Sequence, residues 1–338
     1  MMNQEHPCLN CGHPITQTDK FCPQCGQGTD EHLMTFKELV SHFFNSFTNL
    51  DNSAFQTVKY IARPWKLTQF YVEGKKKSFL NPIRVFLILM LFHFGLIFSS
   101  INFGKFSFEN ELSQKAELHK MYTNYKEIEK AYIGRCDSMK MMIDTTLFSS
   151  YDTLNKDTLF PISTPTRSYR ISAHDILEMD QDSINKKYHF TKFTEKLFAK
   201  QIIKSAKDLS STLQYMLGNF MWVIILSILT LAGFFKLIYY KSKKTYVEHL
   251  VFLLNVHSFA FLVNTILFYI NSSFFDLDWK YYILFFFIPS TIFFISLYKY
   301  YQQRKFITFL KSTMSCFVYT MTNLIFMVLT IILSFLIF

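Results

Sequence analysis

Five long apolar stretches constrain the fold of this chain more than any other feature of its sequence. The 338 residues include 40 Phe and are 50% hydrophobic and 18% aromatic, which is too apolar for one soluble domain. Each stretch has roughly 18–25 residues, enough for a helix to cross the hydrocarbon core of a bilayer. They occupy residues 83–101, 220–240, 250–270, 281–298 and 314–338. We therefore predict an all-α integral membrane protein with five transmembrane helices in contact with lipid.

The distribution of Lys and Arg predicts the orientation of these helices. The connection between the third and fourth stretches has only Lys280, beside Asp276 and Asp278. Basic clusters precede the first stretch and follow the second and fourth: Lys59, Arg63, Lys66, Lys75, Lys76, Lys77 and Arg84; Lys236, Lys241, Lys243 and Lys244; Lys299, Arg304, Lys305 and Lys311. Because cytoplasmic loops are enriched in basic residues, this pattern predicts a cytoplasmic N-terminus and an extracytoplasmic C-terminus. The formal charge of +10 then reflects membrane orientation and contact with anionic lipid.

Four cysteines near the N-terminus form two CxxCG motifs separated by ten residues. They are Cys8, Cys11, Cys22 and Cys25, and Gly12 and Gly26 follow the second cysteine of each pair. Four thiolates at this spacing can close tetrahedrally around one structural Zn²⁺, so residues 1–30 are predicted to be a small zinc ribbon. Glycine permits the positive φ at which backbone N–H groups fold back onto the sulfurs. Reduced thiolates also indicate the cytoplasm, in agreement with the basic clusters.

Other metals and other roles for the four cysteines are less consistent with the sequence. An iron site of the rubredoxin kind is the main alternative metal, although the ten-residue spacer is short for that fold. Four thiolates leave no open coordination position for catalysis. Residues 1–30 have Lys20 as their only Lys or Arg, against Glu5, Asp19 and Asp30, which disfavours nucleic-acid binding. A protein contact or self-stabilisation is the expected role.

Two segments outside the apolar stretches have distinct compositions. Residues 31–82 are expected to form amphipathic interfacial helices, which lie on the inner leaflet or the bundle or dock a partner. Residues 102–219 carry 17 Lys and Arg against 15 Asp and Glu. We expect a small, mostly helical extracytoplasmic domain there, with Ser172 as the N-cap of one helix. Cys136 has no candidate partner in this domain. Residues 1–30 are polar throughout, so 83–101 is expected to be an uncleaved signal anchor.

Several motifs resemble an uncharacterised bacterial family of zinc-ribbon, multi-span membrane proteins, a domain-of-unknown-function group. They are the ribbon, Thr57-Val-x-x-Ile61-x-x-Pro64, Tyr71-x-x-Gly74-Lys75, Phe79-x-x-Pro82, and Tyr246-Val-Glu248-His249 leading to His257-Ser258-Phe259. The resemblance covers these blocks and the order of the parts, and the external segment matches only loosely. It implies a bacterial inner (cytoplasmic) membrane location, and it brings no substrate and no catalytic residue.

Polar residues within the apolar stretches are the remaining candidates for function. His249, His257, Asn264 and Asn271 fall within an arc of about 80° on one helix, with Glu248 and Asn255 on a neighbouring flank. Such an arc is expected to face the bundle interior, where it either forms interhelical hydrogen bonds or lines a polar pathway. His93 in the first stretch is expected to bond to a neighbouring helix or to join a proton relay.

No catalytic constellation is evident in the sequence, so we name no catalytic residue and lean toward a non-enzymatic function. The favoured hypothesis is an interaction or scaffold protein with protein partners on the cytoplasmic and extracytoplasmic sides. The alternative is a transporter or channel for a small solute. It would use 250–270 as a polar wall, with His93 or Ser290 and Thr291 opposite, and Pro289 would interrupt a helix near the middle of the membrane.

Overall fold

The computed structural model of the chain is mostly helical. It describes residues 6–16, 18–29, 35–37, 52–101, 111–131, 159–165, 167–274 and 279–337. Most of the segment expected to form the first interfacial helix, and Cys136, lie outside the described residues. The described part divides into two compact units, one formed by Met1–Ser100 and Met221–Phe326, the other by Ile101–Phe220 and Met327–Phe338. Each unit is described by itself.

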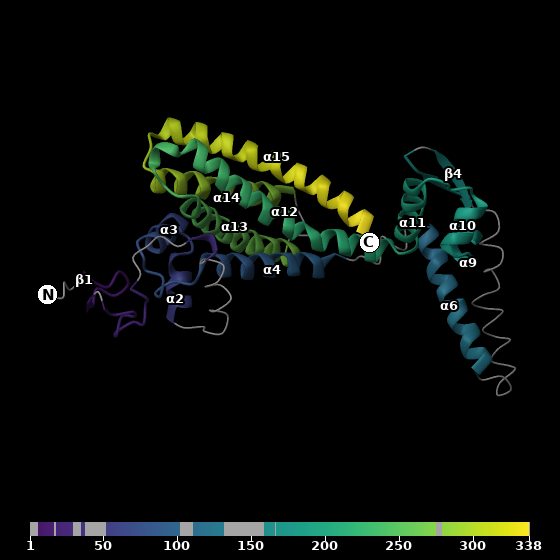
Figure 1. Ribbon diagram of the computed structural model, residues 1–338, viewed down its shortest axis with the longest axis horizontal. Coiled ribbons are helices and arrows are strands. Elements are labelled where there is room, and N and C mark those ends of the chain that lie inside the picture. The colour runs from purple at the N-terminus through teal and green to yellow at the C-terminus, as the bar shows by residue number, and fades with distance from the viewer. Residues whose placement is uncertain are drawn as a thin grey trace. The chain divides into compact units, whose positions relative to one another are not determined.

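The first unit contains the ribbon, two short helices and most of the apolar helices (Figure 1). The ribbon begins with the two-residue strands β1 (His6–Pro7) and β2 (Pro14–Ile15), which pair antiparallel. The helices α2 (Asn52–Tyr60) and α3 (Pro64–Val72) follow. Pro64 at the start of α3 separates the two, because proline fits the first turn of a helix and cannot continue a preceding one.

Five described helices are long and apolar enough to cross a membrane. They are α4 (Pro82–Ser100), α12 (Leu209–Ile238), α13 (Tyr246–Phe274), α14 (Trp279–Tyr301) and α15 (Lys305–Ile337). Each overlaps one of the stretches identified from the sequence, and α12 begins 11 residues before its stretch. A mostly helical fold with five candidate spans is therefore confirmed.

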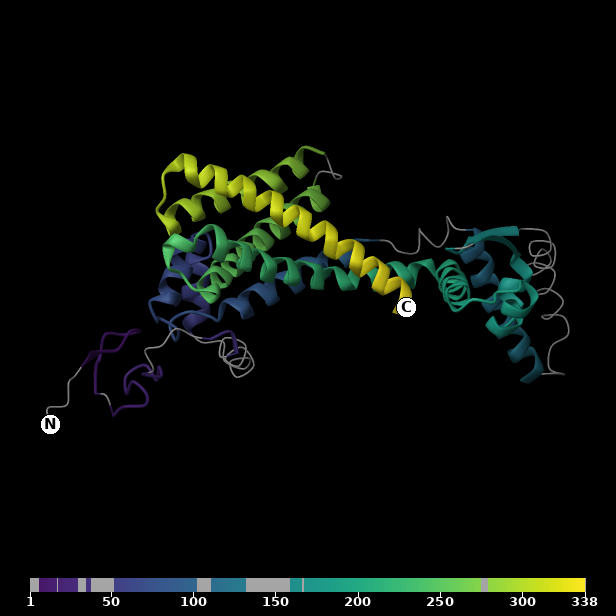
Figure 2. The ribbon, with the colours of Figure 1, turned by 45° about the horizontal axis from the view of Figure 1, so that its top comes forward.

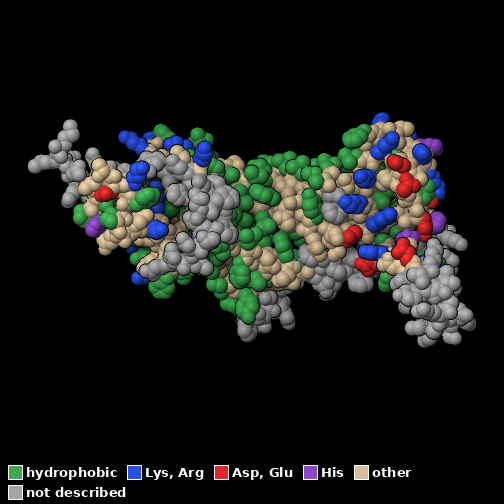
Figure 3. Space-filling model, turned by 60° about the horizontal axis from the view of Figure 1, so that its bottom comes forward, with side chains coloured by type: hydrophobic (Ala, Val, Ile, Leu, Met, Phe, Trp, Pro, Cys, Tyr) green, Lys and Arg blue, Asp and Glu red, His purple; other side chains and the backbone are tan. Residues whose placement is uncertain are grey.

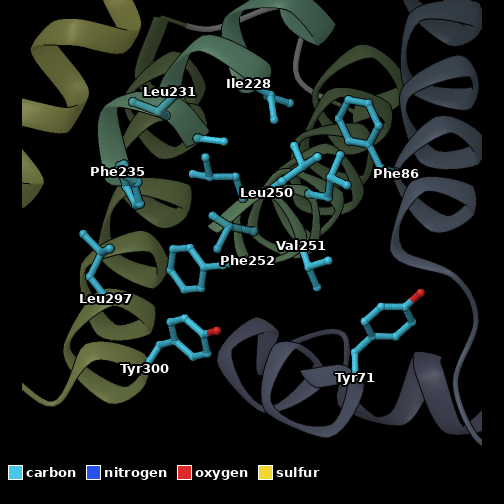
Figure 4. Packing of buried hydrophobic residues seen from close by; sticks show 14 of the residues in the cluster. Tyr71, Phe86, Ile228, Leu231, Phe235, Leu250, Val251, Phe252, Leu297 and Tyr300 are labelled. Atoms are coloured by element: carbon cyan, nitrogen blue, oxygen red, sulfur yellow. The ribbon is translucent and has the colours of Figure 1, made fainter. Parts of the chain in front are cut away.

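The central helix of the first unit is α13. Of its most apolar 18 residues, 61% are buried, against 6% in α15. It packs against α3, α4 and α14, and α4 runs beside it in Figure 2. Figure 4 shows the core around α13, which includes Phe86 of α4, Phe235 of α12 and Tyr300 of α14. The polar arc of α13 thus lies on the most enclosed helix of the unit.

The outer surface of this unit separates apolar from basic side chains. Apolar side chains cover the surface of the long helices, whereas Lys and Arg gather near the end that carries the ribbon, α2 and α3 (Figure 3). The same end receives basic side chains that bond the ends of α12 and its neighbours: Lys311 Nζ donates to the Ile238 carbonyl at 2.8 Å, and Lys236 Nζ to that of Lys244. Cations near the carboxyl end of a helix complement its dipole.

The second unit is a small α+β body. Its elements are α6 (Glu111–Ala131), the antiparallel hairpin β3 (Leu159–Ser163) and β4 (Ser168–Ser172), and the helices α9 (Ala173–Glu178), α10 (Gln181–Lys187) and α11 (Phe193–Lys207). Ile171, Ile176 and Ile184 are buried in its core. Ser172 is the N-cap residue of α9, although its side chain makes no capping hydrogen bond. We expected this region to be mostly helical, and the structure has one β-hairpin in addition to the helices.

Candidate functional site

The four ribbon cysteines lie close together and meet the geometric requirements of a zinc site. Their four Sγ atoms all lie within 4.8 Å of one another. The Sγ atoms of Cys8 and Cys25 are 3.7 Å apart, and those of Cys11 and Cys22 are 3.6 Å apart. A tetrahedron with Zn–S bonds of about 2.3 Å has edges of about 3.8 Å. The donor set and its spacing are therefore consistent with one structural Zn²⁺, as the sequence predicts.

The two halves of the ribbon repeat the same local backbone arrangement. In each half, the amide of the glycine donates to the carbonyl of the first cysteine, at 2.8 Å for Gly12 to Cys8 and at 2.8 Å for Gly26 to Cys22. The two glycines have φ of +78° and +68°, in the region that disfavours side chains. The positive φ at these two positions thus explains why a glycine follows each cysteine pair.

The ribbon is attached to the segment that follows α3. Gln27 Nε2 donates to the Gly74 carbonyl at 2.7 Å, and Gln27 Oε1 accepts from the Lys77 amide at 3.2 Å. Asn10 Oδ1 accepts from the Ser78 amide at 3.0 Å. Gln27 is also buried. A carboxamide that bonds the backbone with both its atoms fixes position and orientation together, so the ribbon has a defined seat on residues 74–78.

Gly74 terminates α3 and contacts the ribbon at the same point. Its amide donates to Tyr71 and the next amide, of Lys75, donates to Phe70, which is the hydrogen-bond pattern of a Schellman motif. Its φ is +93°. A Cβ atom built on Gly74 would lie 2.8 Å from Cδ1 of Leu9 in the ribbon. The sequence motif Tyr71-x-x-Gly74-Lys75 therefore marks both a helix end and a close approach.

Comparison with known protein families finds two separate matches, one on each side of the contact between the ribbon and its seat. Residues 8–28 match a zinc-ribbon domain, and residues 51–94 match the family described as Protein of unknown function (DUF3667). The chain carries these two domains. No curated protein and no solved structure matched the chain. The DUF3667 match contains α2, α3, the seat of the ribbon and the first part of α4.

Several of the polar residues singled out from the sequence have defined hydrogen-bond partners. Glu248 accepts from the Thr245 amide, and its own amide donates to Thr245 Oγ1 at 3.3 Å, which is a capping box at the start of α13. The fully buried His249 forms a hydrogen bond of 2.6 Å through Nδ1 with the Tyr301 hydroxyl of α14. His93 Nδ1 lies 2.9 Å from Thr265 Oγ1 of α13.

His257 and Asn264 instead line a cavity of about 280 Å³ formed by residues of α12, α13, α14 and α15. His257 Nδ1 lies 2.8 Å from the Leu253 carbonyl, so this nitrogen carries a proton and donates it to that oxygen. Asn264 Oδ1 is buried without a hydrogen-bond partner among the described residues. Pro289 and Ser290 of α14 line the same cavity, and Thr291 and His93 do not.

The polar arc of α13 therefore divides into two parts. Glu248 and His249 do not line the cavity, so no continuous polar path joins them to Asn264 within the described residues. Asn255, on the flank of the arc, bonds Thr68 of α3 at 3.1 Å. His249 and Asn255 thus bond neighbouring helices, whereas His257 and Asn264 adjoin open space.

The second unit contains a buried carboxylate, Asp175, whose partners the sequence did not predict. Asp175 accepts hydrogen bonds from Lys187 Nζ at 2.7 Å and from the Tyr188 hydroxyl. Burial by itself raises the pKa of Asp175, but these two hydrogen bonds stabilise the carboxylate more, and its pKa lies below the ordinary value. The tyrosine also accepts from the Ser172 amide at 3.2 Å. The group joins β4, α9 and the end of α10, which indicates a structural role.

Proposed function

We propose that this chain is a bacterial inner-membrane protein with its N-terminus in the cytoplasm and its C-terminus outside. The basic residues at the ends of the spans and the reduced thiolates of the ribbon support this orientation independently. A reporter active only in the cytoplasm, fused after Phe338, should be silent, and one fused at the N-terminus should be active. An active C-terminal fusion would place both termini in the cytoplasm and would therefore rule out an odd number of spans.

We further propose that the protein is an interaction or scaffold protein whose zinc ribbon presents a cytoplasmic docking face. The observation that carries this proposal is the seat of the ribbon, where Gln27 and Asn10 bond the backbone of residues 74–78. A seated ribbon presents its outer side chains in a fixed orientation, which lowers the entropic cost of binding a partner. Phe21, which is 67% exposed on the ribbon, is the expected apolar anchor of that contact.

Crosslinking and affinity capture from membranes would test this docking role. Phe21→Ser should remove cytoplasmic partners that the unaltered chain captures, while the zinc content stays the same. Gln24→Ala, at an exposed position between Cys22 and Cys25, is the matched control and should leave the partners unchanged. Deletion of residues 1–50 should have the same effect as Phe21→Ser. An identical set of partners in all three variants would eliminate the docking role.

A second candidate function is passage or binding of a small solute, which the cavity beside His257 and Asn264 favours. Water access to that cavity distinguishes the two functions. In a chain with Cys136→Ser and Cys316→Ser, the variants Asn264→Cys and Ser290→Cys should react with a charged, membrane-impermeant thiol reagent if the cavity opens to water. Ile266→Cys, at a half-exposed position on α13, is the control for reaction from lipid. Unreactive cavity positions would exclude an aqueous pathway there.

A further inference from the structure

A second cavity, of about 480 Å³, lies in the region that matches DUF3667. Its walls come from α2, α3 and the segment 75–79. The residues that line it include Ser53 and Gln56 of α2, Phe70 of α3, and Lys75, Lys77 and Phe79 of the following segment. It is unrelated to the cavity between the membrane spans, and neither the zinc ligands nor the polar arc of α13 contributes to it.

The cavity combines an aromatic floor with basic and hydroxyl-bearing walls. Phe70 and Phe79 stack with ring centroids 5.1 Å apart, and Tyr60 packs edge-on against both. Lys75 Nζ lies 4.6 Å from the centroid of Phe70 and 3.3 Å from Glu73 Oε2. Such a cavity suits a ligand with an anionic head and an apolar body, because lysine acts as a point charge toward phosphate.

The surrounding charge favours an anion. Residues 52–82 contain six Lys and Arg against one acidic residue, Glu73. Lys77 is exposed and Lys75 is partly exposed, so Glu73 offsets only part of the positive charge at the cavity. A phosphate placed between the two lysines would be attracted by both, and the Ser53 and Gln56 side chains could donate hydrogen bonds to it.

The position of the cavity favours a lipid over a soluble phosphate. The apolar helix α4 begins at Pro82, three residues after Phe79. On α2, Phe55 and Val58 are 71% and 67% exposed, as expected for side chains that enter the membrane interface. A headgroup bound here would leave its acyl chains beside the start of α4.

The zinc ribbon holds the basic wall of this cavity. Gln27 bonds the carbonyl of Gly74 and the amide of Lys77, and Asn10 bonds the amide of Ser78, which also lines the cavity. The backbone amide of Lys77 is therefore bonded to the ribbon, whereas that of Lys75 is held by the Schellman motif at the end of α3, next to the Gly74 carbonyl that Gln27 bonds.

We propose that the cavity formed by α2, α3 and residues 75–79 binds the phosphate headgroup of an anionic phospholipid, and that the seated ribbon preorganises its lysines. This site goes beyond the docking role proposed above and does not depend on it, since it needs the inner contacts of the ribbon and not the outer face that carries Phe21. Loss of protein partners and loss of lipid binding are thus separable results.

Lipid binding to the full-length protein in detergent, counted by native mass spectrometry, tests the site. Phosphatidylglycerol should bind more tightly than phosphatidylcholine. The double variant Lys75→Gln/Lys77→Gln should weaken phosphatidylglycerol binding roughly thirtyfold, since each interfacial lysine contributes about a fivefold factor. The matched control Lys59→Gln/Lys66→Gln removes the same charge outside the cavity and should change binding by less than about threefold.

Three results would overturn the proposal. They are equal binding of the two lipids, equal losses in the two double variants, and displacement of phosphatidylglycerol by millimolar inorganic phosphate. The first would show no selectivity for an anionic headgroup, the second would leave only general electrostatic attraction, and the third would assign the site to a soluble phosphate.

The variant Gln27→Ala tests the contribution of the ribbon without altering a zinc ligand. It should weaken phosphatidylglycerol binding by up to about thirtyfold, because each of its two lost hydrogen bonds corresponds to about a fivefold factor. The control Gln24→Ala should bind as the unaltered chain does. Zinc measured in each variant should remain at about one equivalent. Unchanged lipid binding in Gln27→Ala with zinc retained would refute the preorganising role.

Discussion

Replacing Gly74 by alanine should detach the zinc ribbon from its seat. Gly74 has φ of +93°, and an L-residue in the left-handed region costs about 1–2 kcal/mol. Its new Cβ would also lie 2.8 Å from Cδ1 of Leu9 and 3.1 Å from its Cβ. Turning Leu9 away from a favoured rotamer costs about 0.5–1.5 kcal/mol. The seated state should therefore lose about 2–3 kcal/mol relative to the detached one.

Hydrogen exchange provides a direct assay, because the amides of Lys77 and Ser78 donate to the ribbon side chains. A loss of about 2–3 kcal/mol should accelerate their exchange about 30- to 150-fold, or up to the rate of an unprotected amide. Gly95→Ala is the matched control, since nothing lies within 4 Å of a Cβ at that position and the helix α4 accepts alanine.

A double variant separates the two causes. Leu9→Ala combined with Gly74→Ala removes the closest contact but leaves the backbone strain, so about 1 kcal/mol should be recovered. Unchanged exchange at Lys77 and Ser78 in Gly74→Ala would show that the ribbon does not depend on this seat, and the argument from the close approach would fail.

Three further outcomes are expected from the remaining contacts. Metal analysis of the isolated ribbon should give about one equivalent of zinc, which Cys11→Ser lowers, whereas iron in protein from zinc-replete cells would contradict the assignment. Asp175→Ala should destabilise the second unit by about 2–3 kcal/mol, measured by urea unfolding followed by circular dichroism, because the Tyr188 hydroxyl loses its acceptor and the Lys187 ammonium loses its partner. Since the pKa of Asp175 is lowered on folding, its contribution should be complete above about pH 4 and should be lost as the pH falls through the lower folded-state value. Thr265→Val should lower thermal stability in detergent by about 0.6 kcal/mol through loss of the bond to His93, and the same loss in a His93→Phe background would show that the two do not interact.

The zinc site and the helical spans were predictable because their signals are local. Four cysteines at fixed spacing define their own geometry, and a long apolar run defines a helix without reference to the rest of the chain. Glu248 also had a local signal that was not used. Thr245-x-x-Glu248 is a capping box, and this explains a charged residue at the start of α13 without any polar pathway.

The seat of the ribbon could not be predicted, because it depends on contacts between distant residues. Gln27 and Gly74 are 47 positions apart, and no periodicity relates them. The helical periodicity of α13 likewise predicts that His249 and His257 lie on one face of the helix, but it does not predict which residues each of them contacts. One contacts Tyr301 and the other lines a cavity, and that difference is set by how α14 and α15 pack.

The lengths of the candidate membrane-spanning helices have a consequence for a bilayer that they would cross. At 1.5 Å per residue, the 19 residues of α4 extend about 28 Å and the 33 residues of α15 extend about 50 Å. A hydrocarbon core of about 30 Å therefore matches α4 nearly upright, whereas α15 must tilt or extend beyond the core. The 29 residues of α13 extend about 43 Å, and the part of α13 that packs directly on α4 is matched to an average membrane. Thicker or thinner membranes should thus change the tilt of α15 before they disturb the packing around α13.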